Sequence, residues 1–262
     1  MITFIIPTIG RKTLANAVKS IEGQTNNNWK AIIIFDGIEP TFSTTNPKIT
    51  ILKNVKEGRD RNSAGNVRNY GMKRVDTEWL AFLDDDDVIA SDYVEIFNKE
   101  LVGHPSTDVL IFRMYNATNN TILPKLKTDN FYLNEVGISF AMKTSIFASG
   151  LKFTPSPIED YLYLHKMREQ KYTIMISPYI KYFPNSQSEV NIMKDKFGNR
   201  VIIKPDGSIE SFANIRSENF NWLMIFLLAF MILLVILIFI FTSYKSNVSK
   251  KYFRNILKSI GL

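Results

Sequence analysis

The stretch Trp79–Leu83 is apolar and runs straight into four consecutive aspartates, Asp84 to Asp87. Five apolar or aromatic residues in a row predict a buried strand, because the run is too short for a helix that stands alone. The aspartates then follow the carboxyl end of this strand, which is where open α/β sheets bind ligands. The sequence therefore predicts an α/β fold with an acidic site at one edge of its sheet.

Four adjacent carboxylates repel one another strongly unless a cation lies among them. A hard divalent ion such as Mg²⁺ or Mn²⁺ meets this need, and it usually completes its ligand shell with substrate phosphates. The alternative is a solvated acidic turn, in which Asp86 or Asp87 caps the next helix. Because an apolar strand leads directly into the cluster, we favour the metal site.

Strands alternate with helices along the first 170 residues. The hydrophobic pattern predicts strands over 3–6, 30–35, 49–52, 108–115 and 138–142, helices over 11–23, 64–75, 91–102, 143–149 and 159–170, a polar loop over the site at 116–135 and a hairpin at 200–212. This alternation predicts a mostly parallel sheet with helices on both faces. A dinucleotide oxidoreductase and a P-loop NTPase are disfavoured, because the sequence has neither Gly-x-Gly-x-x-Gly after the first strand nor Gly-Lys-Ser/Thr anywhere.

The excess of basic residues belongs to the carboxyl-terminal end of the chain. The net charge is +7, and five of these charges lie after residue 244, which leaves +2 for residues 1–244. A nucleic-acid-binding function is therefore disfavoured, because it would need a basic surface on the folded domain. Cysteine is absent, which excludes a disulfide framework, zinc–thiolate ligands and a thiol nucleophile.

One long apolar segment, Trp222–Phe241, contains twenty residues without a charge. At about 1.5 Å per residue a helix of this length spans roughly 30 Å, the thickness of the hydrocarbon core of a bilayer. We therefore expect a single-pass membrane protein with a domain over 1–215, a linker over 216–221 and a transmembrane helix over 222–242. Residues 243–262 then form either a basic amphipathic helix on the membrane surface or a disordered basic tail.

Two opposing rules bear on the orientation of this segment in the membrane. No signal-peptide pattern precedes the first strand, so the domain over 1–215 is expected in the cytosol. The positive-inside tendency places the basic residues after the apolar run in the cytosol as well. The two rules conflict, because twenty residues are too few to cross the bilayer twice as helices. We expect the first rule to hold, so that the tail either crosses the membrane despite its charge or stays with a segment that only dips into the bilayer.

Five short motifs occur in order over about residues 2–170: Phe-Ile-Ile-Pro-Thr at the start, Asp36-Gly37 after the second strand, Gly65 to Gly71, Phe82 to Asp87, and Glu159-Asp160. Together they resemble family 2 glycosyltransferases of the GT-A fold. The resemblance implies an inverting enzyme that transfers a sugar from a nucleotide-diphosphate donor to a glycan, lipid or protein acceptor. It also implies Mn²⁺ or Mg²⁺ as the cofactor.

The resemblance assigns part of these motifs to the donor. Pro7 and Thr8 match the loop that contacts the base, and Asp36 matches the acceptor for a pyrimidine edge or the ribose. Arg68 lies on a predicted helix that leads toward the site and would pair with the phosphates. The alternatives are a turn-forming role for Asp36, which precedes Gly37, and an ordinary solvated side chain for Arg68.

The resemblance assigns the remaining acidic residues to the metal and to catalysis. Asp84 and Asp86 match the Asp-x-Asp motif, with Asp86 on the metal and Asp84 or Asp85 reaching the ribose or a metal-bound water. Asp160 matches the general base, which removes the proton of the acceptor hydroxyl, while Glu159 orients Asp160 or binds the acceptor. The alternative is a pair of carboxylates favoured by the dipole at the start of a helix.

Two features depart from the pattern of the family. The Gln-x-x-Arg-Trp motif of processive synthases is absent, so synthesis of a long polymer is not predicted. No histidine follows His165, which leaves the third protein ligand of the metal open or replaced by water. Two other functions stay open: a catalytically inactive GT-A module that binds sugar or acts as a scaffold, and a nucleotidyltransferase with Thr8–Lys12 as its basic loop. The intact Asp84, Asp86 and Asp160 favour the active glycosyltransferase.

Overall fold

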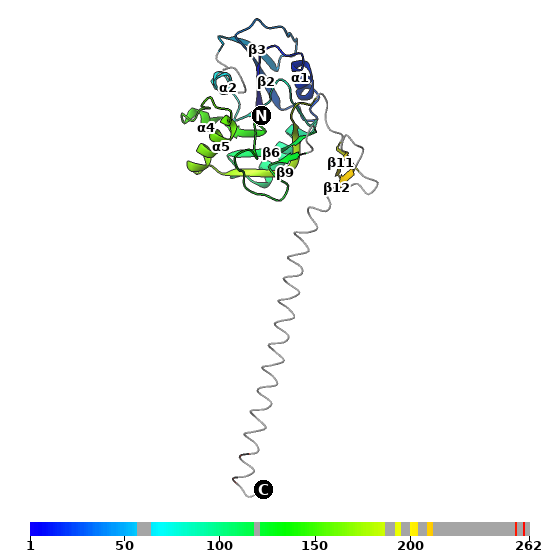
Figure 1. The fold of residues 1–262 in the computed structure, drawn as a ribbon, viewed down its shortest axis with the longest axis vertical. Coiled ribbons are helices and arrows are strands. Elements are labelled where there is room, and N and C mark those ends of the chain that lie inside the picture. Colours follow the sequence, from blue (N-terminus) through cyan, green and yellow to red (C-terminus); the bar gives the residue numbers. More distant parts are fainter. Residues whose placement is uncertain are drawn as a thin grey trace. The chain divides into compact units, whose positions relative to one another are not determined.

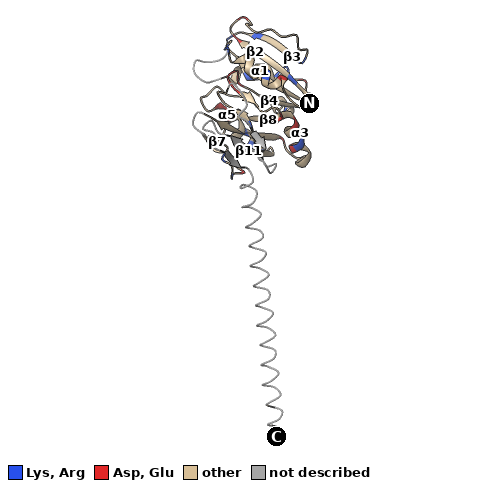
Figure 2. Cartoon of the chain, turned by 90° about the vertical axis from the view of Figure 1, so that its right-hand side faces the viewer, with Lys and Arg blue, Asp and Glu red and all other residues tan. Residues whose placement is uncertain are grey.

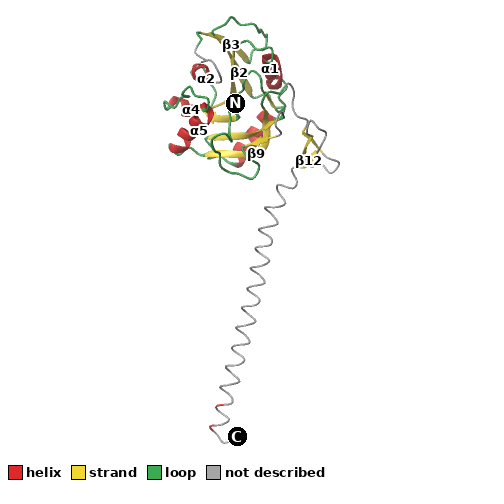
Figure 3. Cartoon of the chain, viewed as in Figure 1, coloured by secondary structure: helices red, strands yellow, loops and turns green. Residues whose placement is uncertain are grey.

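The computed structural model describes residues 1–56, 64–117, 121–186, 192–194, 200–203 and 209–211, together with Asn255 and Ser259. The chain divides into two compact units, Met1–Lys194 with Val201–Glu210, and Asp195–Arg200 with Ser211–Leu262. The predicted linker and transmembrane helix, and all but two residues of the predicted basic tail, lie outside the described residues. Within the described part of the chain, no helix is long and apolar enough to cross a membrane. Several helices and strands of the first unit are labelled in Figure 1, and Figure 3 colours them by type.

The amino-terminal half of the main sheet is parallel, as predicted. Strand β1 (Ile2–Thr8) lies between β2 (Trp29–Asp36) and β4 (Trp79–Phe82), and β3 (Ile49–Asn54) pairs with β2 on the outside. Strands β1 and β4 are buried along their whole length, and β4 contains no charged residue (Figure 2). Continuous apolar runs of this kind are typical of parallel strands that are covered on both faces.

The other half of the sheet is mixed, so the prediction of a mostly parallel sheet is wrong there. The strand order is β3-β2-β1-β4-β8-β6-β9-β5, with β8 (Phe140–Lys143), β6 (Val109–Asn116), β9 (Ile174–Phe183) and β5 (Val88–Ile89), while β7 (Thr121–Leu123) pairs with β6. Strand β8 runs antiparallel to both of its neighbours, β4 and β6. A strand that is buried on both faces is apolar whether it runs parallel or antiparallel to its neighbours. The residue pattern of β8 therefore carries no signal for the direction of this strand.

Helices cover both faces of the sheet, as predicted. They are α1 (Leu14–Glu22), α2 (Gly65–Met72), α3 (Tyr93–Gly103), α4 (Thr144–Ala148) and α5 (Glu159–Glu169). Phe4 of β1 packs edge-on against Tyr93 of α3 at 5.4 Å between ring centroids, whereas the neighbouring Ile5 packs against Gly71 of α2. Since adjacent residues of a strand point to opposite faces, α2 and α3 lie on opposite sides of the sheet.

Strand β1 continues through Pro7 to Thr8 instead of ending at residue 6. The carbonyl of Ile5 accepts a hydrogen bond from the backbone N–H of Leu83, so the backbone groups of residues 5 and 7 face β4. Because Ile5 is already paired with Phe82, the last residue of β4, the missing N–H of Pro7 falls beyond that strand. The proline therefore interrupts no ladder hydrogen bond.

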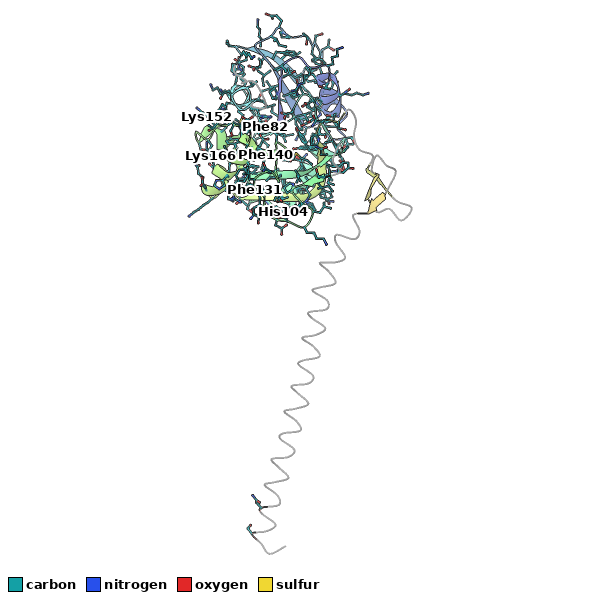
Figure 4. All side chains as sticks on the ribbon, viewed as in Figure 1. Phe82, His104, Phe131, Phe140, Lys152 and Lys166 are labelled. Atoms are coloured by element: carbon teal, nitrogen blue, oxygen red, sulfur yellow. The ribbon has the colours of Figure 1, made fainter. Side chains whose placement is uncertain are left out.

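A cluster of aromatic rings ties the start of α5 to the sheet. Phe82 of β4 contacts Phe140 of β8 with 5.2 Å between the ring centroids (Figure 4). The ring centroid of Phe153 lies 5.3 Å from that of Phe82 and 4.1 Å from that of Tyr163 of α5. Edge-on and tilted contacts between buried rings add to the stabilisation from their burial. This packing fixes the position of α5, and with it the position of Glu159 and Asp160.

Three further short strands, β10 (Ile192–Lys194), β11 (Arg200–Ile203) and β12 (Ile209–Ser211), form a separate sheet in this order. Strands β11 and β12 correspond to the two arms of the hairpin predicted at 200–212, and its turn at 204–208 lies outside the described residues. Strands β5, β7 and β9 were not predicted. Strand β7 falls within the predicted polar loop, whose residues 118–120 also lie outside the described part.

Candidate active site

A cleft of about 710 Å³ opens at the edge where β1, β2 and β4 end. A volume of this size is within the usual range for small-molecule sites. Its wall includes Asn116, Thr121 and Leu123 of β6 and β7, so part of the predicted polar loop does lie over the cleft. The structure brings together in this cleft all nine residues predicted for the site: Pro7, Thr8, Asp36, Arg68, Asp84, Asp85, Asp86, Glu159 and Asp160.

Arg68 of α2 connects two groups of these carboxylates. Its side chain is only 4% exposed, and its Nη2 donates a hydrogen bond of 2.5 Å to Asp84 Oδ1. Its Nη1 donates to Glu159 Oε1 at 2.7 Å and lies 3.6 Å from Asp160 Oδ1. Although burial acts to lower it, the three carboxylates raise the pKa of Arg68 above its ordinary value. The alternative of an ordinary solvated arginine is therefore wrong, while its pairing with phosphates stays a prediction.

Glu159 is buried at the start of α5 and is bound to α2. Its Oε1 accepts hydrogen bonds from Nη1 of Arg68 and, at 2.9 Å, from the backbone N–H of Ala64, the residue before α2. Backbone N–H groups at the start of a helix favour a carboxylate. These contacts hold Glu159 in place, which favours the orienting role over direct binding of an acceptor.

Gly65 makes this close approach of α2 to Glu159 possible. A Cβ atom at position 65 would lie 2.6 Å from Glu159 Oε2 and 2.8 Å from Phe153 Cβ. Replacing Gly65 with alanine should therefore lower the free energy of unfolding by about 1–3 kcal/mol, the usual cost of overpacking, measured by urea denaturation. Gly103→Ala is the matched control, because a Cβ there would meet nothing within 4 Å. Equal stabilities of the two variants would contradict the close contact.

Asp160 differs from Glu159 because its side chain is open to the cleft. It is 26% exposed, and among the described residues none donates a hydrogen bond to its buried Oδ1 atom. Burial raises the pKa of Asp160 to about 7; Arg68 opposes the rise, and Asp84 and Glu159 add to it. A carboxylate that is partly exposed in a cleft and has a pKa near neutrality suits a general base.

Asp85 and Asp86 share a basic side chain that was not predicted for the site. Nη1 of Arg11 donates to Asp85 Oδ1 at 3.0 Å and to Asp86 Oδ2 at 2.6 Å. Asp85 is buried and also accepts a hydrogen bond of 2.5 Å from Thr8 Oγ1. The sequence did carry a signal for Arg11, since it is a basic residue in the turn that follows the first strand.

Asp87 also lines the cleft, but both oxygens of its carboxylate are bound to β9 and the residues that follow it. Its Oδ2 accepts a hydrogen bond of 2.7 Å from the hydroxyl of Tyr182, and its Oδ1 accepts one of 2.7 Å from the backbone N–H of Asn185. Burial, together with the charge of Asp84, raises the pKa of Asp87 to about 8. The next helix, α3, begins at Tyr93 with Asp92 before it, so the alternative that Asp86 or Asp87 caps that helix is wrong.

Comparison with known proteins identifies the family. Residues 3–153, which are more than half of the chain, match the family described as glycosyl transferase family 2. The chain belongs to this family. An uncharacterized glycosyltransferase of Haemophilus influenzae is 26% identical over 191 residues, which cover 65% of the chain and 63% of that protein. An uncharacterized glycosyltransferase of Rickettsia conorii is 34% identical over 97 residues, covering 36% of the chain and 16% of that protein. The chain thus spans less than two thirds of the length of either relative.

Solved structures share the fold of this family 2 protein. TarS of S. aureus, residues 1–349, matches with a TM-score of 0.56 and 16% identity over 70% of the chain and 60% of TarS. TarS in complex with UDP-GlcNAc matches with a TM-score of 0.55 and 20% identity over 70% of the chain and 57% of TarS. At these identities the likeness shows the mixed α/β fold that the resemblance implied.

The cleft of this family 2 protein suits a divalent cation. Among the described residues, seven carboxylates but only three basic side chains line it, which leaves an excess of negative charge where a phosphate would have to bind. Burial raises the pKa of Asp86; Arg11 opposes the rise, and the charges of Asp84 and Asp85 add to it, so the ionised form of Asp86 needs a nearby cation. Within the described ranges no three histidine or carboxylate side chains form a metal site. The fit is therefore to an ion held by two carboxylates and completed by phosphate and water oxygens, as Mg²⁺ often is.

Proposed function

We propose that this protein is an inverting glycosyltransferase that moves a sugar from a nucleotide-diphosphate donor to the hydroxyl group of an acceptor. One observation carries the proposal. Asp84 and Asp86, which suit a metal and a diphosphate, lie in the same cleft as Asp160, whose carboxylate suits a base, and Arg68 connects the two groups.

The donor would lie across the ends of β1, β2 and β4. Pro7, Thr8 and Asp36 would contact the base and ribose, since they line the cleft at the ends of β1 and β2. The structures of TarS with UDP and with UDP-GlcNAc support a donor of the nucleotide-sugar class. Which sugar and which acceptor are used is a matter for assay, and a glycan, a lipid and a protein are the acceptor classes to test.

Asp84 and Asp86 would hold Mn²⁺ or Mg²⁺ together with phosphate oxygens of the donor. When bound, such an ion acts as a Lewis acid that stabilises the negative charge of the departing nucleoside diphosphate. Asp85 accepts hydrogen bonds from Thr8 and, in the empty cleft, from Arg11, and the bond from Thr8 holds the end of β1 against the acidic cluster.

Asp160 would act as the general base. Its carboxylate takes the proton of the acceptor hydroxyl while that oxygen forms a bond to the anomeric carbon, and the bond from this carbon to the phosphate oxygen breaks. The acceptor oxygen attacks from the face opposite the leaving group and thereby inverts the configuration at the anomeric carbon. Glu159, held by Ala64 and Arg68, keeps Asp160 oriented toward the cleft.

The proposal keeps a membrane anchor at residues 222–242 and a cytosolic catalytic domain. The uncharged apolar run Trp222–Phe241 supports the anchor. A lipid-linked or membrane-borne acceptor would then be within reach of the cleft.

A panel of nucleotide sugars, incubated with the full chain and Mn²⁺, tests the proposal. We expect release of a nucleoside diphosphate from at least one of them, faster when acceptor candidates are added. Release of pyrophosphate instead would indicate a nucleotidyltransferase. Binding of a nucleotide sugar without release of any product, across all acceptor classes, would indicate an inactive sugar-binding module.

A further inference from the structure

Arg11 is held over the acidic cluster by an unusual turn. Gly10, the residue before it, has φ = +80°, and a Cβ atom there would lie 2.6 Å from Ile38 Cδ1. Any other residue would be strained at this position, both by its backbone conformation and by the contact. The turn directs Arg11 toward Asp85 and Asp86, and the arginine side chain, 46% exposed, lines the cleft.

A single nitrogen of Arg11 bridges Asp85 and Asp86, at 3.0 and 2.6 Å. The guanidinium group of Arg11 therefore neutralises Asp86, the carboxylate that suits a divalent cation. Two cations on one carboxylate repel each other, so a metal ion and Arg11 compete for it. Arg68 cannot leave its partners in the same way, because it is buried and bound to carboxylates on two elements. Arg11 can leave Asp85 and Asp86, because ion pairs at half-exposed positions are weak.

We propose that Arg11 is a donor-binding residue that neutralises Asp86 in the empty cleft and moves to the diphosphate of the donor when a divalent ion binds Asp86. The inference rests on the proposed function, because it requires a diphosphate donor and a metal ion. A guanidinium group matches the geometry of phosphate oxygens with two parallel hydrogen bonds, so the released side chain has a partner of the right charge and shape. Arg11 thereby couples the binding of metal to the binding of donor.

Lys12 provides the matched control. It is the next residue along the chain, carries the same charge, is exposed, and does not line the cleft. The variants Arg11→Gln and Lys12→Gln each remove one positive charge from the same turn. Only the first removes a charge that is bound to the aspartates.

The first measurement is a titration with Mn²⁺ alone, followed by electron paramagnetic resonance on the full chain. Without the competing guanidinium, Arg11→Gln should bind Mn²⁺ about tenfold more tightly than the wild type, as expected for a unit charge a few ångströms from a divalent ion. The affinity of Lys12→Gln for Mn²⁺ should stay within about twofold of that of the wild type, because the charge of Lys12 is solvated and screened. Unchanged or weaker binding of Mn²⁺ by Arg11→Gln, or no binding by the wild type, would overturn the proposal.

The second measurement compares UDP with UMP, and GDP with GMP, by calorimetry in saturating Mn²⁺. Arg11→Gln should lose about tenfold in affinity for the diphosphate that the wild type binds and little for the monophosphate, since it loses a charge-assisted contact to the second phosphate. An unchanged ratio of the two affinities would overturn the donor-binding role. The titration with Mn²⁺ needs neither sugar nor turnover, so its outcome stands even if the panel of nucleotide sugars contradicts the glycosyltransferase.

Discussion

Replacing Asp86 with alanine should abolish transfer, lowering turnover by at least about 10³-fold, because Lewis-acid stabilisation of a leaving group contributes several kcal/mol. Asp86 suits a metal because it lines the cleft beside Asp84 and Asp85, where its carboxylate is bound by the movable side chain of Arg11. Release of nucleoside diphosphate in the presence of Mn²⁺ is the measurement. Asp76→Ala is the control, since Asp76 is an exposed aspartate that pairs with Lys30 and does not line the cleft.

Thermal denaturation separates loss of metal from loss of fold. In EDTA the Asp86→Ala variant should melt at the same temperature as the wild type or higher, because burial and the neighbouring carboxylates disfavour the ionised form of Asp86. Addition of Mn²⁺ should stabilise the wild type, since a ligand that binds only the folded state raises its stability, and should leave the variant unchanged. Undiminished turnover of the wild type in excess EDTA would contradict the metal hypothesis.

Replacing Asp160 with asparagine should lower kcat by at least about 10²-fold, the usual effect of removing a general base. The substitution keeps the size of the side chain but leaves no carboxylate to take the proton. The affinity for the nucleotide sugar should change little, because in the proposed mechanism Asp160 contacts the hydroxyl group of the acceptor and not the nucleotide. Single-turnover kinetics with saturating donor would measure the loss, and a near-normal kcat would move the base to another group, with Glu159 the first to test.

The pH profile gives a separate check on Asp160. Its pKa is raised to about 7, so the carboxylate is largely protonated below pH 7 and cannot act as a base there. For the wild type, kcat/KM should therefore rise with pH and level off above about pH 7. The residual activity of Asp160→Asn should lack this acid limb. An unchanged profile in the variant would show that the limb belongs to another group.

The parallel half of the fold and the location of the site followed from local signals in the sequence. The apolar runs of β1, β2 and β4 are each followed by a polar residue that lines the cleft, and parallel strands bring such ends to one edge. The pattern of residues alone therefore predicts that Thr8, Asp36 and Asp84 lie close together, as they do. Their predicted chemical roles stay predictions.

The second half of the sheet depended on contacts that no local pattern reports. Strand β9 contains Ser177, Pro178 and Lys181, which break the apolar run, yet it pairs with β6 and, through its last two residues, with β5. Lys181 is only 2% exposed and is neutralised by Asp92 at 2.6 Å. A buried lysine of this kind needs a partner from a distant part of the chain, so the linear sequence does not identify its segment as a strand.

The partners of the basic residues were also beyond the sequence. Arg11 and Arg68 were both visible as charges near predicted strand ends, but the carboxylates they bind are set by the packing of α2, α5 and the turn after β1. Electrostatic pairing depends on distances of a few ångströms and on burial, neither of which a linear pattern contains. For this reason Arg11 was missed, and the burial of Arg68 was not predicted.

The two glycines of α2 have a consequence for the order in which the protein folds. The helix is only eight residues long, with Gly65 at its start, Gly71 near its end and asparagine at two of the positions between, so it has little intrinsic tendency to form. Gly71 packs against Ile5 and Ile34 of the sheet, and Gly65 packs against Glu159 of α5. We expect α2 to become helical only after the sheet and α5 are in place, so that its amide protons exchange with solvent together with those of α5. The position of Arg68, which joins the two groups of carboxylates in the cleft, would then be set by the last step of folding. A chain released before that step would have a formed sheet and an incomplete cleft.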